Sequence, residues 1–447
     1  MNYLEAEAYL NSLQFHKIKL GLDAMRSFLK QVHHPELKLK FIHVAGTNGK
    51  GSVSMTLLTI LARLGNRVGL YTSPHLSSVR ERLRINDSYI SKEKFAGIAT
   101  RIREVLGEEK ITYFEFTTAL AFLWFAESDL DLVILETGLG GRLDATNVVV
   151  PLVSVITNVS MDHEAYLGDT LESIAYEKAG IIKAGVPVVN GTEEERTTGV
   201  IRKRCRELGV ELYQHGEAFA TETAGDGAWI WRGLNGPLAG RNLPGLRCSM
   251  RGSYQIRNAS LSLAALALLA DRGVAASPAD IRAGLLEVRW PGRLEYIVLD
   301  RKSRKQIFDP EPGDDNLVHY LLDGAHNPAG VDSLVLTLKE EYTYRRLIVV
   351  WGAMVDKDLA RTIPAIGAMA DRIIFTRPSG ERAADPAQLL AWLPAGLQTR
   401  AECVADVTQA LLTAEKAAGP GDIIVVAGSL YLIGAVRTGL VGELVPE

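Results

Sequence analysis

The chain has few cysteines: Cys205, Cys248 and Cys403 are three among 447 residues and stand far apart. Disulfide frameworks and zinc sites need paired cysteine spacings, so we expect neither, and the chain fits a reducing cytosol. It also lacks an uninterrupted apolar run of about 18 residues, the length that spans a membrane. Residues 1–13 include acidic side chains and do not resemble a signal peptide. We therefore expect a cytoplasmic protein without a membrane partner.

An excess of charge of one sign is also missing. The 49 Lys and Arg residues nearly balance the 53 Asp and Glu residues, giving a net charge of -4. No long basic run exists, so nucleic acid is not an expected partner. Apolar residues make up 47% of the chain, which is ample for sizeable cores. The length favours two to three domains.

A glycine-rich stretch follows an apolar run near the start of the chain. Residues 41–44 (Phe-Ile-His-Val) predict a short buried strand, and a helix is predicted to begin near Gly51. Glycine lets backbone N–H groups approach an anion, a lysine adds positive charge, and a serine hydroxyl can face a magnesium ion. This combination predicts a triphosphate site, with ATP as the first hypothesis. The residues concerned are Gly46, Thr47, Asn48, Gly49, Lys50, Gly51 and Ser52.

The spacing of this loop departs from the usual P-loop. That motif has four residues between its first Gly and the Gly-Lys pair, with Ser or Thr directly after Lys. Here only Thr47 and Asn48 intervene, and Gly51 separates Lys50 from Ser52. A strand-to-helix turn without a ligand is the alternative, which the lysine and hydroxyl after a buried strand disfavour.

Strand and helix patterns alternate along the chain. Runs separated by helical segments are typical of parallel sheets covered on both faces. The glycine-rich stretch 213–252, with Trp229 and Trp231 around an Asp226-Gly227 turn, instead predicts a small antiparallel excursion, followed by a helix at 255–270. Further strands are predicted at 67–72, 131–135, 152–157, 186–189, 320–322, 347–351, 372–376 and 422–427.

We therefore expect an α/β protein with two domains. Residues 1–294 would form a P-loop-containing, doubly wound, mostly parallel sheet domain that carries the antiparallel excursion. Residues 295–447 would form a smaller, Rossmann-like α/β domain. The boundary is placed near Leu294, because Trp-Pro-Gly-Arg at 290–293 breaks the pattern. The polar stretch 301–316 is expected to be an exposed loop or a hairpin extension.

Polar residues gather where predicted parallel strands end, which is where doubly wound sheets bind ligands. Glu136 suits magnesium, which prefers oxygen ligands, and a solvated or capping glutamate is the alternative. His163 follows another strand, and Asp162 could orient its ring, although a lone histidine there is more often structural. In the second domain, Asp323 could accept hydrogen bonds from a ribose and His326 could face a phosphate. A helix N-cap turn is the alternative for this pair.

Three further residues have simple alternatives. Arg142 could hold an anionic or planar substrate group, or pair with Asp144. Lys178 stands at a predicted helix end, where a solvated lysine or a partner of Glu177 is the default. Ser429 follows the last strand and could bind a carboxylate, or form a simple strand-to-helix turn.

Taken together, these residues resemble the folylpolyglutamate synthase/dihydrofolate synthase family, within the wider group of Mur-type amide ligases. The loop at 43–52 matches the family's nucleotide loop, so its spacing is no longer an objection. The folate-type assignment rests on the blocks at 73–76 and 141–147. The stretch 301–316 makes the start of the second domain longer than expected for the family, which indicates a surface elaboration. The resemblance covers almost the whole chain through blocks, in family order, at 43–52, 72–76, 112–116, 139–147, 177–180, 291–293, 323–328, 356–358 and 428–431.

The resemblance also implies roles for single residues. Lys50, His163, Lys178 and His326 are the implied catalytic residues, and Lys178 matches a lysine that the family carboxylates to a carbamate. The implied ligands of a pair of magnesium sites are Ser73, Glu136, His163 and Ser52. Implied nucleotide contacts beyond the loop are Asn258, Arg293 and Asp323. The implied folate pocket contains Ile18, Lys19, Leu20, Tyr113, Phe114, Glu115, Arg142, Leu143, Asp144 and Ala145. The implied glutamate contacts are His326 and Ser429.

The implied activity is ATP-dependent addition of L-glutamate to a carboxylate of dihydropteroate, of a reduced folate, or of both. The carboxylate would pass through an acyl phosphate, with Lys50 and magnesium neutralising the transferring phosphoryl group, in a monomeric enzyme.

Three other functions are weighed against this one. Another Mur-type ligase, for example one acting on a cell-wall precursor, should need a nucleotide-sugar-binding N-terminal domain, for which the about 40 residues before the loop are too few. An ATP-dependent switch or binding protein would have no turnover to lose when Glu136 is changed. A plain P-loop kinase would leave the blocks at 177–180 and 323–328 without a role.

Overall fold

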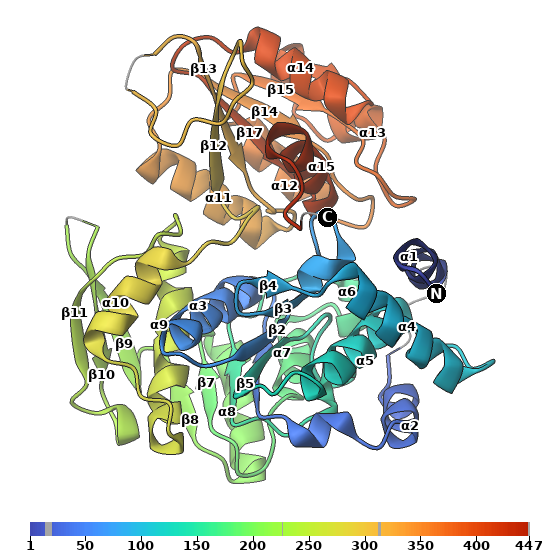
Figure 1. The fold of residues 1–447 in the computed structure, drawn as a ribbon. Helices are drawn as coiled ribbons and strands as arrows, with labels where there is room; N and C mark the ends of the chain where they lie inside the picture. Colours follow the sequence, from blue (N-terminus) through green and yellow to red (C-terminus); the bar gives the residue numbers. More distant parts are fainter. Residues whose placement is uncertain (14–19, 226, 312–313, 446–447) are drawn as a thin grey trace.

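The computed structural model describes residues 1–13, 20–225, 227–311 and 314–445. It contains two α/β bodies, one above the other in Figure 1, and the first strand of the second body begins at Glu295. The expected fold class is confirmed: a large, mostly parallel sheet with an antiparallel excursion, followed by a second α/β sheet. The expectations for Ile18, Lys19 and Asp226 lie outside the described residues. Within the described residues, the structure contains no helix whose length and apolar character would let it cross a membrane.

The first body is built on an eight-stranded sheet with the order β4-β3-β2-β5-β1-β6-β7-β8. Six neighbouring strands from β2 to β8 run parallel, and β3 and β4 add an antiparallel edge. Because β1 lies between β5 and β6, the carboxyl ends of these three strands meet at one edge. The strands are β1 (Phe41–Ala45), β2 (Val68–Tyr71), β3 (Leu83–Ile85), β4 (Ser88–Tyr89), β5 (Leu132–Glu136), β6 (Val153–Ile156), β7 (Val188–Asn190) and β8 (Leu212–Gln214).

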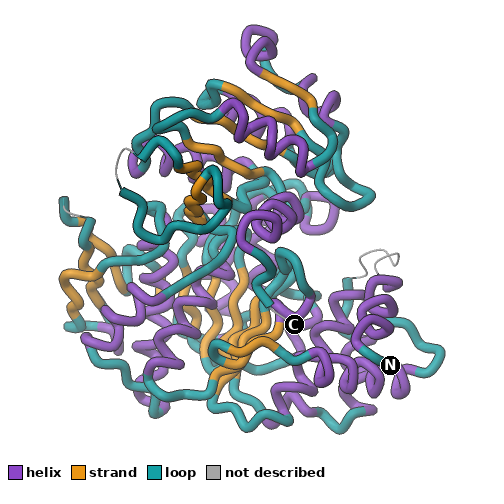
Figure 2. The backbone as a smooth tube through the Cα atoms, turned by 45° about the horizontal axis from the view of Figure 1, so that its top comes forward, coloured by secondary structure: helices purple, strands orange, loops and turns teal. Residues whose placement is uncertain are grey.

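Helices cover both faces of this sheet (Figure 2). Side chains of a strand alternate between faces, so Ile42 and Val44 enter the core beneath α3, α9 and α10, whereas Phe41 enters the core beneath α1, α2, α4 and α5. Helix α5 is buried from Glu115 to Phe125, because it is apolar around nearly its whole circumference. The helices are α1 (Tyr3–Ser12), α2 (Asp23–Gln31), α3 (Lys50–Arg63), α4 (Lys92–Leu106), α5 (Tyr113–Ala126), α6 (Glu164–Leu167), α7 (Leu171–Ala179), α8 (Glu195–Leu208), α9 (Tyr254–Leu269) and α10 (Pro278–Glu287).

The antiparallel excursion is a three-stranded sheet with the order β11-β10-β9. Its strands are β9 (Phe219–Thr223), β10 (Trp229–Gly233) and β11 (Asn242–Leu246). Trp229 and Trp231 stand two residues apart on β10, so they share one face, and both are fully buried in the core that contains α3 and α9. The small sheet therefore covers α9.

The second body has a six-stranded sheet with the order β12-β13-β17-β14-β15-β16. Strands β12 and β13 form an antiparallel hairpin, and the stretch 301–316 belongs to the connection between them. The other neighbours are parallel. The strands are β12 (Glu295–Asp300), β13 (Leu317–Leu322), β14 (Leu347–Trp351), β15 (Arg372–Phe375), β16 (Ala401–Cys403) and β17 (Ile423–Ala427). The helices are α11 (Pro328–Glu341), α12 (Leu359–Gly367), α13 (Pro386–Ala391), α14 (Val407–Ala417) and α15 (Leu430–Val441).

Helix α15 of the second body rests on the loop that follows β2 in the first body. A Cβ on Gly434 would lie 2.1 Å from the backbone oxygen of Leu76. A Cβ on Gly292, in the connection between the bodies, would lie 2.8 Å from Ile433 Cδ1 and 3.2 Å from Leu76 Cδ1. Glycine at these two positions lets the two bodies approach closely.

Replacing Gly434 with Ala is expected to loosen this contact. The added methyl would meet a backbone oxygen that cannot rotate away, so α15 must shift, at a cost of about 1–3 kcal/mol. Thermal unfolding monitored by calorimetry should show a lower transition temperature. The matched control is Gly439→Ala on the same helix, where nothing lies within 4 Å and alanine should be neutral or stabilising. Equal transition temperatures for the two variants would contradict the prediction.

Candidate active site

The loop between β1 and α3 (residues 46–52, the nucleotide loop) leaves no room for side chains at its first two glycines. A Cβ on Gly46 would lie 1.8 Å from Thr157 Oγ1, and a Cβ on Gly49 would lie 2.4 Å from Asn258 Oδ1. Gly49 is also the N-cap of α3, with a φ of 82° that favours glycine. The structure therefore places Asn258, an implied nucleotide contact, against the loop.

The segment after β6 holds the nucleotide loop through hydrogen bonds. Asn48 N donates to Asn158 Oδ1 at 2.8 Å, and Thr47 Oγ1 donates to the Ser160 oxygen at 3.1 Å. Lys50 Nζ folds back and donates to two loop carbonyls, at 3.0 and 3.2 Å. Sequence reasoning assigned no role to Asn158 or Ser160, although their position after a strand beside β1 was a usable signal.

The glycine that separates Lys50 from Ser52 faces Trp290. A Cβ on Gly51 would lie 2.8 Å from Trp290 Nε1, and the described residues offer that buried N–H no acceptor. Ser52, one residue further along α3, is buried. The Gly-Lys-Gly order is therefore required by an indole ring that packs on the loop.

Gly51→Ala is expected to weaken ADP binding about tenfold or more, because overpacking of 1–3 kcal/mol falls on the nucleotide loop itself. Titration calorimetry with ADP measures this effect. Gly199→Ala on α8, where nothing lies within 4 Å, is the control and should bind ADP as the wild-type protein does. Unchanged ADP affinity in Gly51→Ala would show that Trp290 does not constrain the loop.

Glu136 ends β5 directly beside Val44 of β1. Its carboxylate is 4% exposed, and the hydrogen bond it accepts comes from Ser73 N at 3.4 Å. Burial raises the pKa of this carboxyl to about 7, although the positive charge of Lys50 opposes the shift. Within the described part of the chain this carboxylate forms no ion pair, and a buried carboxylate beside a serine fits a hard divalent cation.

A ready-made metal centre is absent from the described residues, where no three His, Cys, Asp or Glu side chains gather around a common point. Magnesium is commonly bound through one or two carboxylates together with water and substrate phosphates. The pair formed by Glu136 and Ser73 therefore fits a metal that arrives with a nucleotide.

His163 begins α6 in a left-handed conformation, with a φ of 54°. Its side chain is 38% exposed, and partial desolvation lowers the pKa of the imidazole, whereas the charge of Asp162 opposes that shift. Lys50 acts electrostatically on His163, on Glu136 and on Lys178. The lysine of the nucleotide loop thus lies among the candidate metal ligands and the candidate carbamate.

Asp162 joins the two bodies. Its carboxylate accepts from Lys357 Nζ at 2.7 Å and from Asn327 Nδ2 at 3.0 Å, and His326 Nε2 lies 3.7 Å away. Burial alone would raise its pKa, but His326, His163 and Lys357 hold the pKa of Asp162 well below its usual range. Asn327 also exchanges hydrogen bonds with Asn48 of the nucleotide loop. This cluster gives Lys357, left without a role by the sequence, a place in the site.

Lys178 lies in the last turn of α7 and is 2% exposed. The described residues supply its Nζ with neither a hydrogen-bond acceptor nor an ion pair. Burial, reinforced by the charge of Lys50, lowers its pKa to about 7. The side chain is therefore a buried amine that is partly neutral near physiological pH.

Two simple alternatives from the sequence are wrong. Arg142 does not pair with Asp144: its guanidinium bonds Glu177 Oε1 at 2.8 Å and stacks on Tyr176. Glu177 therefore forms its ion pair with Arg142 and does not pair with Lys178. The reason is close packing: a Cβ on Gly180 would lie 2.3 Å from Arg142, which brings the end of α7 against the loop after β5.

Asp144 organises the loop after β5. Both oxygens of its carboxylate accept hydrogen bonds. The donors are Gly138 N at 2.9 Å, Leu139 N at 2.8 Å, and both the N and the Oγ1 of Thr146. Thr146 Oγ1 in turn contacts His43 Nε2 at 2.9 Å, inside the core. Asp144 thereby holds the backbone on which Leu143 and Ala145 stand.

The start of α5 faces this loop. The Phe114 ring lies against Gly138, where a Cβ would be 2.5 Å away, and the Tyr113 ring lies 5.3 Å from the Arg82 guanidinium carbon. Glu115 Oε2 accepts from the N and Oγ1 of the N-cap Thr112, so it caps the helix. Of the N-terminal folate candidates, the structure describes only Leu20, which is half-buried.

The second body supplies its candidates from the ends of β13 and β17. The buried Asp323 carboxylate accepts from two backbone N–H groups, and burial raises its pKa. Arg293 lies over Gly324, and His326 Nδ1 donates to the Gly324 oxygen at 2.7 Å. Ser429 is the buried N-cap of α15. The structure thus links Asp323, Arg293 and His326, with Ser429 on a neighbouring strand end.

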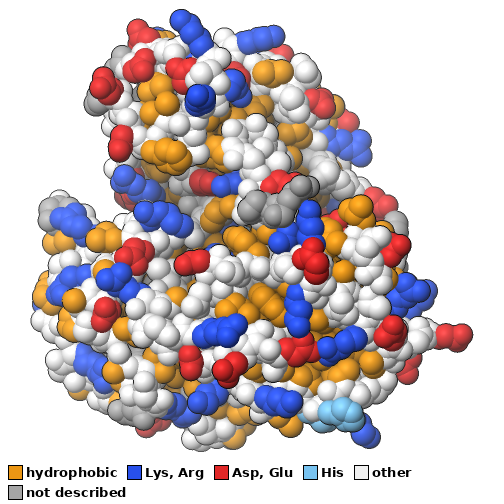
Figure 3. Space-filling model, in the orientation of Figure 1, with side chains coloured by type: hydrophobic (Ala, Val, Ile, Leu, Met, Phe, Trp, Pro, Cys, Tyr) orange, Lys and Arg blue, Asp and Glu red, His pale blue; other side chains and the backbone are white. Residues whose placement is uncertain are grey.

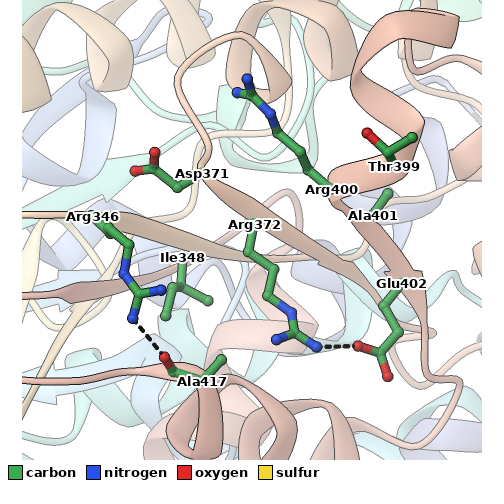
Figure 4. Close-up of a pocket in the computed structure, with 9 residues that line it drawn as sticks. All are labelled: Arg346, Ile348, Asp371, Arg372, Thr399, Arg400, Ala401, Glu402 and Ala417. Carbon is green, nitrogen blue, oxygen red and sulfur yellow. Dashed lines mark hydrogen bonds and ion pairs between the residues drawn. The ribbon is translucent and has the colours of Figure 1, made fainter.

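Figure 3 shows a notch between the two bodies, with basic side chains at its rim. A separate hollow of about 580 Å³ lies at the amino ends of β14, β15 and β16 (Figure 4). Two of its three arginines are already paired, Arg372 with Glu402 and Arg346 with Asp422, both at 2.6 Å. Because ligands of such sheets bind at the carboxyl ends of the strands, this hollow is not the candidate site.

Comparisons with known proteins agree with this geometry. A family model described as the Mur ligase middle domain matches residues 44–266, and one described as the Mur ligase, glutamate ligase domain matches residues 308–430. The dihydrofolate synthase/folylpolyglutamate synthase of Bacillus subtilis is 34% identical over 97% of this chain and 98% of its own length.

Solved structures give the same result. The structure of Escherichia coli FolC in complex with DHPP and ADP has a TM-score of 0.84 at 30% identity, covering 98% of this chain and 97% of that one. A bifunctional folylpolyglutamate synthase/dihydrofolate synthase with Mn, AMPPNP and L-glutamate bound has a TM-score of 0.83 at 32% identity, covering 97% of this chain and 98% of that one. The chain therefore belongs to the folylpolyglutamate synthase/dihydrofolate synthase family of Mur ligases.

Proposed function

We propose that this chain is an ATP-dependent ligase that joins L-glutamate to the carboxylate of a folate-type substrate, and that it accepts both dihydropteroate and reduced folates. The observation that carries the proposal is the buried carboxylate of Glu136 beside Ser73, at the end of the strand next to the nucleotide loop. The relatives named as both dihydrofolate synthase and folylpolyglutamate synthase support the double substrate range.

The reaction must activate a carboxylate, because oxide is a poor leaving group. A carboxylate oxygen of the folate-type substrate attacks the terminal phosphorus of ATP, which forms an acyl phosphate and releases ADP. The amine of L-glutamate then attacks the acyl carbon, inorganic phosphate leaves with the C–O bonding electrons, and the amine loses a proton. Lys50, which now donates to two carbonyls of its own loop, would turn to the phosphate and neutralise its charge.

Ser73, Glu136 and His163, with Ser52 as a further candidate, would hold magnesium in a pair of sites. The bound metal would neutralise phosphate charge and orient the transferring group. Lys178 would add carbon dioxide to its neutral amine and become an anionic carbamate near these ligands. Its buried position and its pKa of about 7 support that modification, because only the neutral amine is nucleophilic.

The second body would complete the site. Asn258, Arg293 and Asp323 would contact the nucleotide, and His326 and Ser429 the incoming glutamate. The cluster around Asp162 would hold the bodies together and exclude water that hydrolyses an acyl phosphate. We further propose that the chain divides into domains at 1–294 and 295–447, and that it works as a cytoplasmic monomer.

The test is ADP release with ATP and magnesium, measured with and without L-glutamate, using dihydropteroate and tetrahydrofolate side by side. The expected result is glutamate-dependent ADP release with both pterin substrates, accompanied by products that are one glutamate heavier. If no glutamate-dependent release occurs with either substrate, the proposed function is wrong.

A further inference from the structure

Arg82 is a buried guanidinium with unfilled hydrogen-bonding capacity. It is 7% exposed, its Nε donates to His75 Nδ1 at 2.9 Å, and it lies over the Tyr113 ring. Among the described residues, no carboxylate forms an ion pair with it. A buried charge without a counter-ion costs several kcal/mol, so its retention points to an anionic ligand.

The neighbouring Arg84 is a buried arginine of the same segment that has a carboxylate partner. It is equally buried, at 8% exposure, and lies 5.0 Å from the Tyr89 ring centroid. However, its Nε donates to the Asn86 oxygen, and its Nη2 pairs with Asp87 at 3.6 Å. Arg82 has the burial and the aromatic stacking of Arg84, but not its carboxylate.

Backbone pairing places Arg82 beside the candidate metal loop. The N–H of Thr72 donates to the Arg82 oxygen at 3.1 Å, one residue before Ser73. The charge of Arg82 also acts on the Glu136 carboxyl and on the Tyr113 hydroxyl. The guanidinium therefore stacks on Tyr113 of the implied pterin pocket and lies within electrostatic reach of Glu136, a candidate metal ligand.

His75 orients this guanidinium. Because Arg82 Nε–H donates to Nδ1, that nitrogen carries no proton and the ring is neutral, so it supplies no positive charge of its own. This hydrogen bond fixes the plane of the Arg82 guanidinium. Its Nη1 and Nη2 are then left to donate to a planar acceptor with two oxygens. A carboxylate has this shape, whereas a neutral pterin ring does not offer a charge.

We propose that Arg82, oriented by His75 and stacked on Tyr113, binds the substrate carboxylate that receives the phosphoryl group. This inference rests on the proposed function and adds the residue that presents the nucleophile. Both pterin substrates must pass through such a carboxylate, so Arg82 serves both reactions. It contacts the reacting oxygens before transfer and the acyl phosphate afterwards.

The test compares Arg82→Lys and Arg82→Gln with the matched control Arg84→Lys. With either Arg82 variant, kcat/KM should fall about 100-fold for dihydropteroate and for tetrahydrofolate alike, because a paired charge-assisted contact to the reacting group is lost. ADP affinity by calorimetry should stay near wild type, and the transition temperature of thermal unfolding should not fall, because Arg82→Gln removes a buried charge. Arg84→Lys should leave both kcat/KM values within about threefold of wild type.

The outcomes separate this inference from the proposed function. Absence of glutamate-dependent turnover in the wild-type enzyme would refute the function. A wild-type enzyme that turns over, with Arg82 variants equal to it, would refute the role of Arg82 alone. Loss with tetrahydrofolate only would also overturn the inference, because dihydropteroate carries only the reacting carboxylate and the residue would then read the second carboxylate of the folate. Equal losses in ADP affinity would mark a structural role and overturn it as well.

Discussion

Glu136→Gln should lower turnover by about 1,000-fold or more while making the metal-free protein more resistant to heat. Loss of activity follows because the amide cannot supply the charge that a divalent cation requires, and electrostatic contributions to phosphoryl transfer are of this size. Glutamate-dependent ADP release at saturating magnesium measures it. A pure nucleotide-binding protein would have no turnover to lose.

The gain in stability follows from the same carboxylate. Its pKa in the folded state is about 7, above the ordinary 4.5, so the folded state holds this proton more tightly than the unfolded state. The stability it contributes is therefore present below pH 4.5 and is lost as the pH rises from 4.5 to 7. Above pH 7 the full cost of the buried charge remains, and glutamine removes it.

Calorimetry at pH 8 without metal should show a higher transition temperature for Glu136→Gln. The control is Glu415→Gln, which removes a buried carboxylate that pairs with Arg304 at 2.8 Å and accepts from Tyr320 at 2.6 Å, and which should therefore lower the transition temperature. A Glu136→Gln protein that unfolds earlier than wild type, or that turns over normally, would contradict the assignment.

Lys178→Met should also reduce turnover by about 1,000-fold, because the site loses the anion that a carbamate would provide near the metal. Carbon-13 NMR after equilibration with labelled bicarbonate should show a carbamate signal in the wild-type protein and none in the variant. Lys183→Met is the control: Lys183 follows α7, bonds the Asn147 oxygen and should be dispensable for turnover. A normal rate for Lys178→Met would refute the carbamate proposal.

Lys178 also predicts a pH dependence of stability. Its pKa is about 7 in the folded state, below the ordinary 10.5, so the unfolded state binds the proton more tightly across that interval. Stability should therefore rise as the pH increases from 7 to 10.5, with the full cost of the buried charge present below pH 7. In Lys178→Met this rise should be flattened, which chemical denaturation at several pH values measures in carbonate-free buffer.

The fold was predictable where strands are buried on both sides. The apolar run predicted at 347–351 is β14 itself, and the run at 131–135 lies within one residue of β5. Strands β3, β4, β8, β12 and β16 were not predicted. Four of them are edge strands and β3 lies next to an edge, where pairing with a partner strand, rather than a long apolar run, defines the strand.

The candidate site was predictable for residues that stand in the sequence at or shortly after the end of a predicted strand. Glu136 and His163 are of this kind, because they follow β5 and β6, whose carboxyl ends lie on either side of β1 at one edge of the sheet. The contact between Asp162 and Lys357 spans 195 residues and depends on how two bodies dock. Arg142 pairs with Glu177 rather than with Asp144. The Asp144 carboxylate already accepts hydrogen bonds from nearby N–H and O–H groups.

The packing of Trp290 on Gly51 has a practical consequence. The indole stands in the short connection that leads into the second body, and its ring contacts the loop that would hold ATP. One aromatic side chain therefore contacts the nucleotide loop and also belongs to the connection between the two bodies. The fluorescence emission of Trp290 should change when ADP binds, and this change should be absent in Trp290→Phe. Tryptophan fluorescence would then report directly on nucleotide binding.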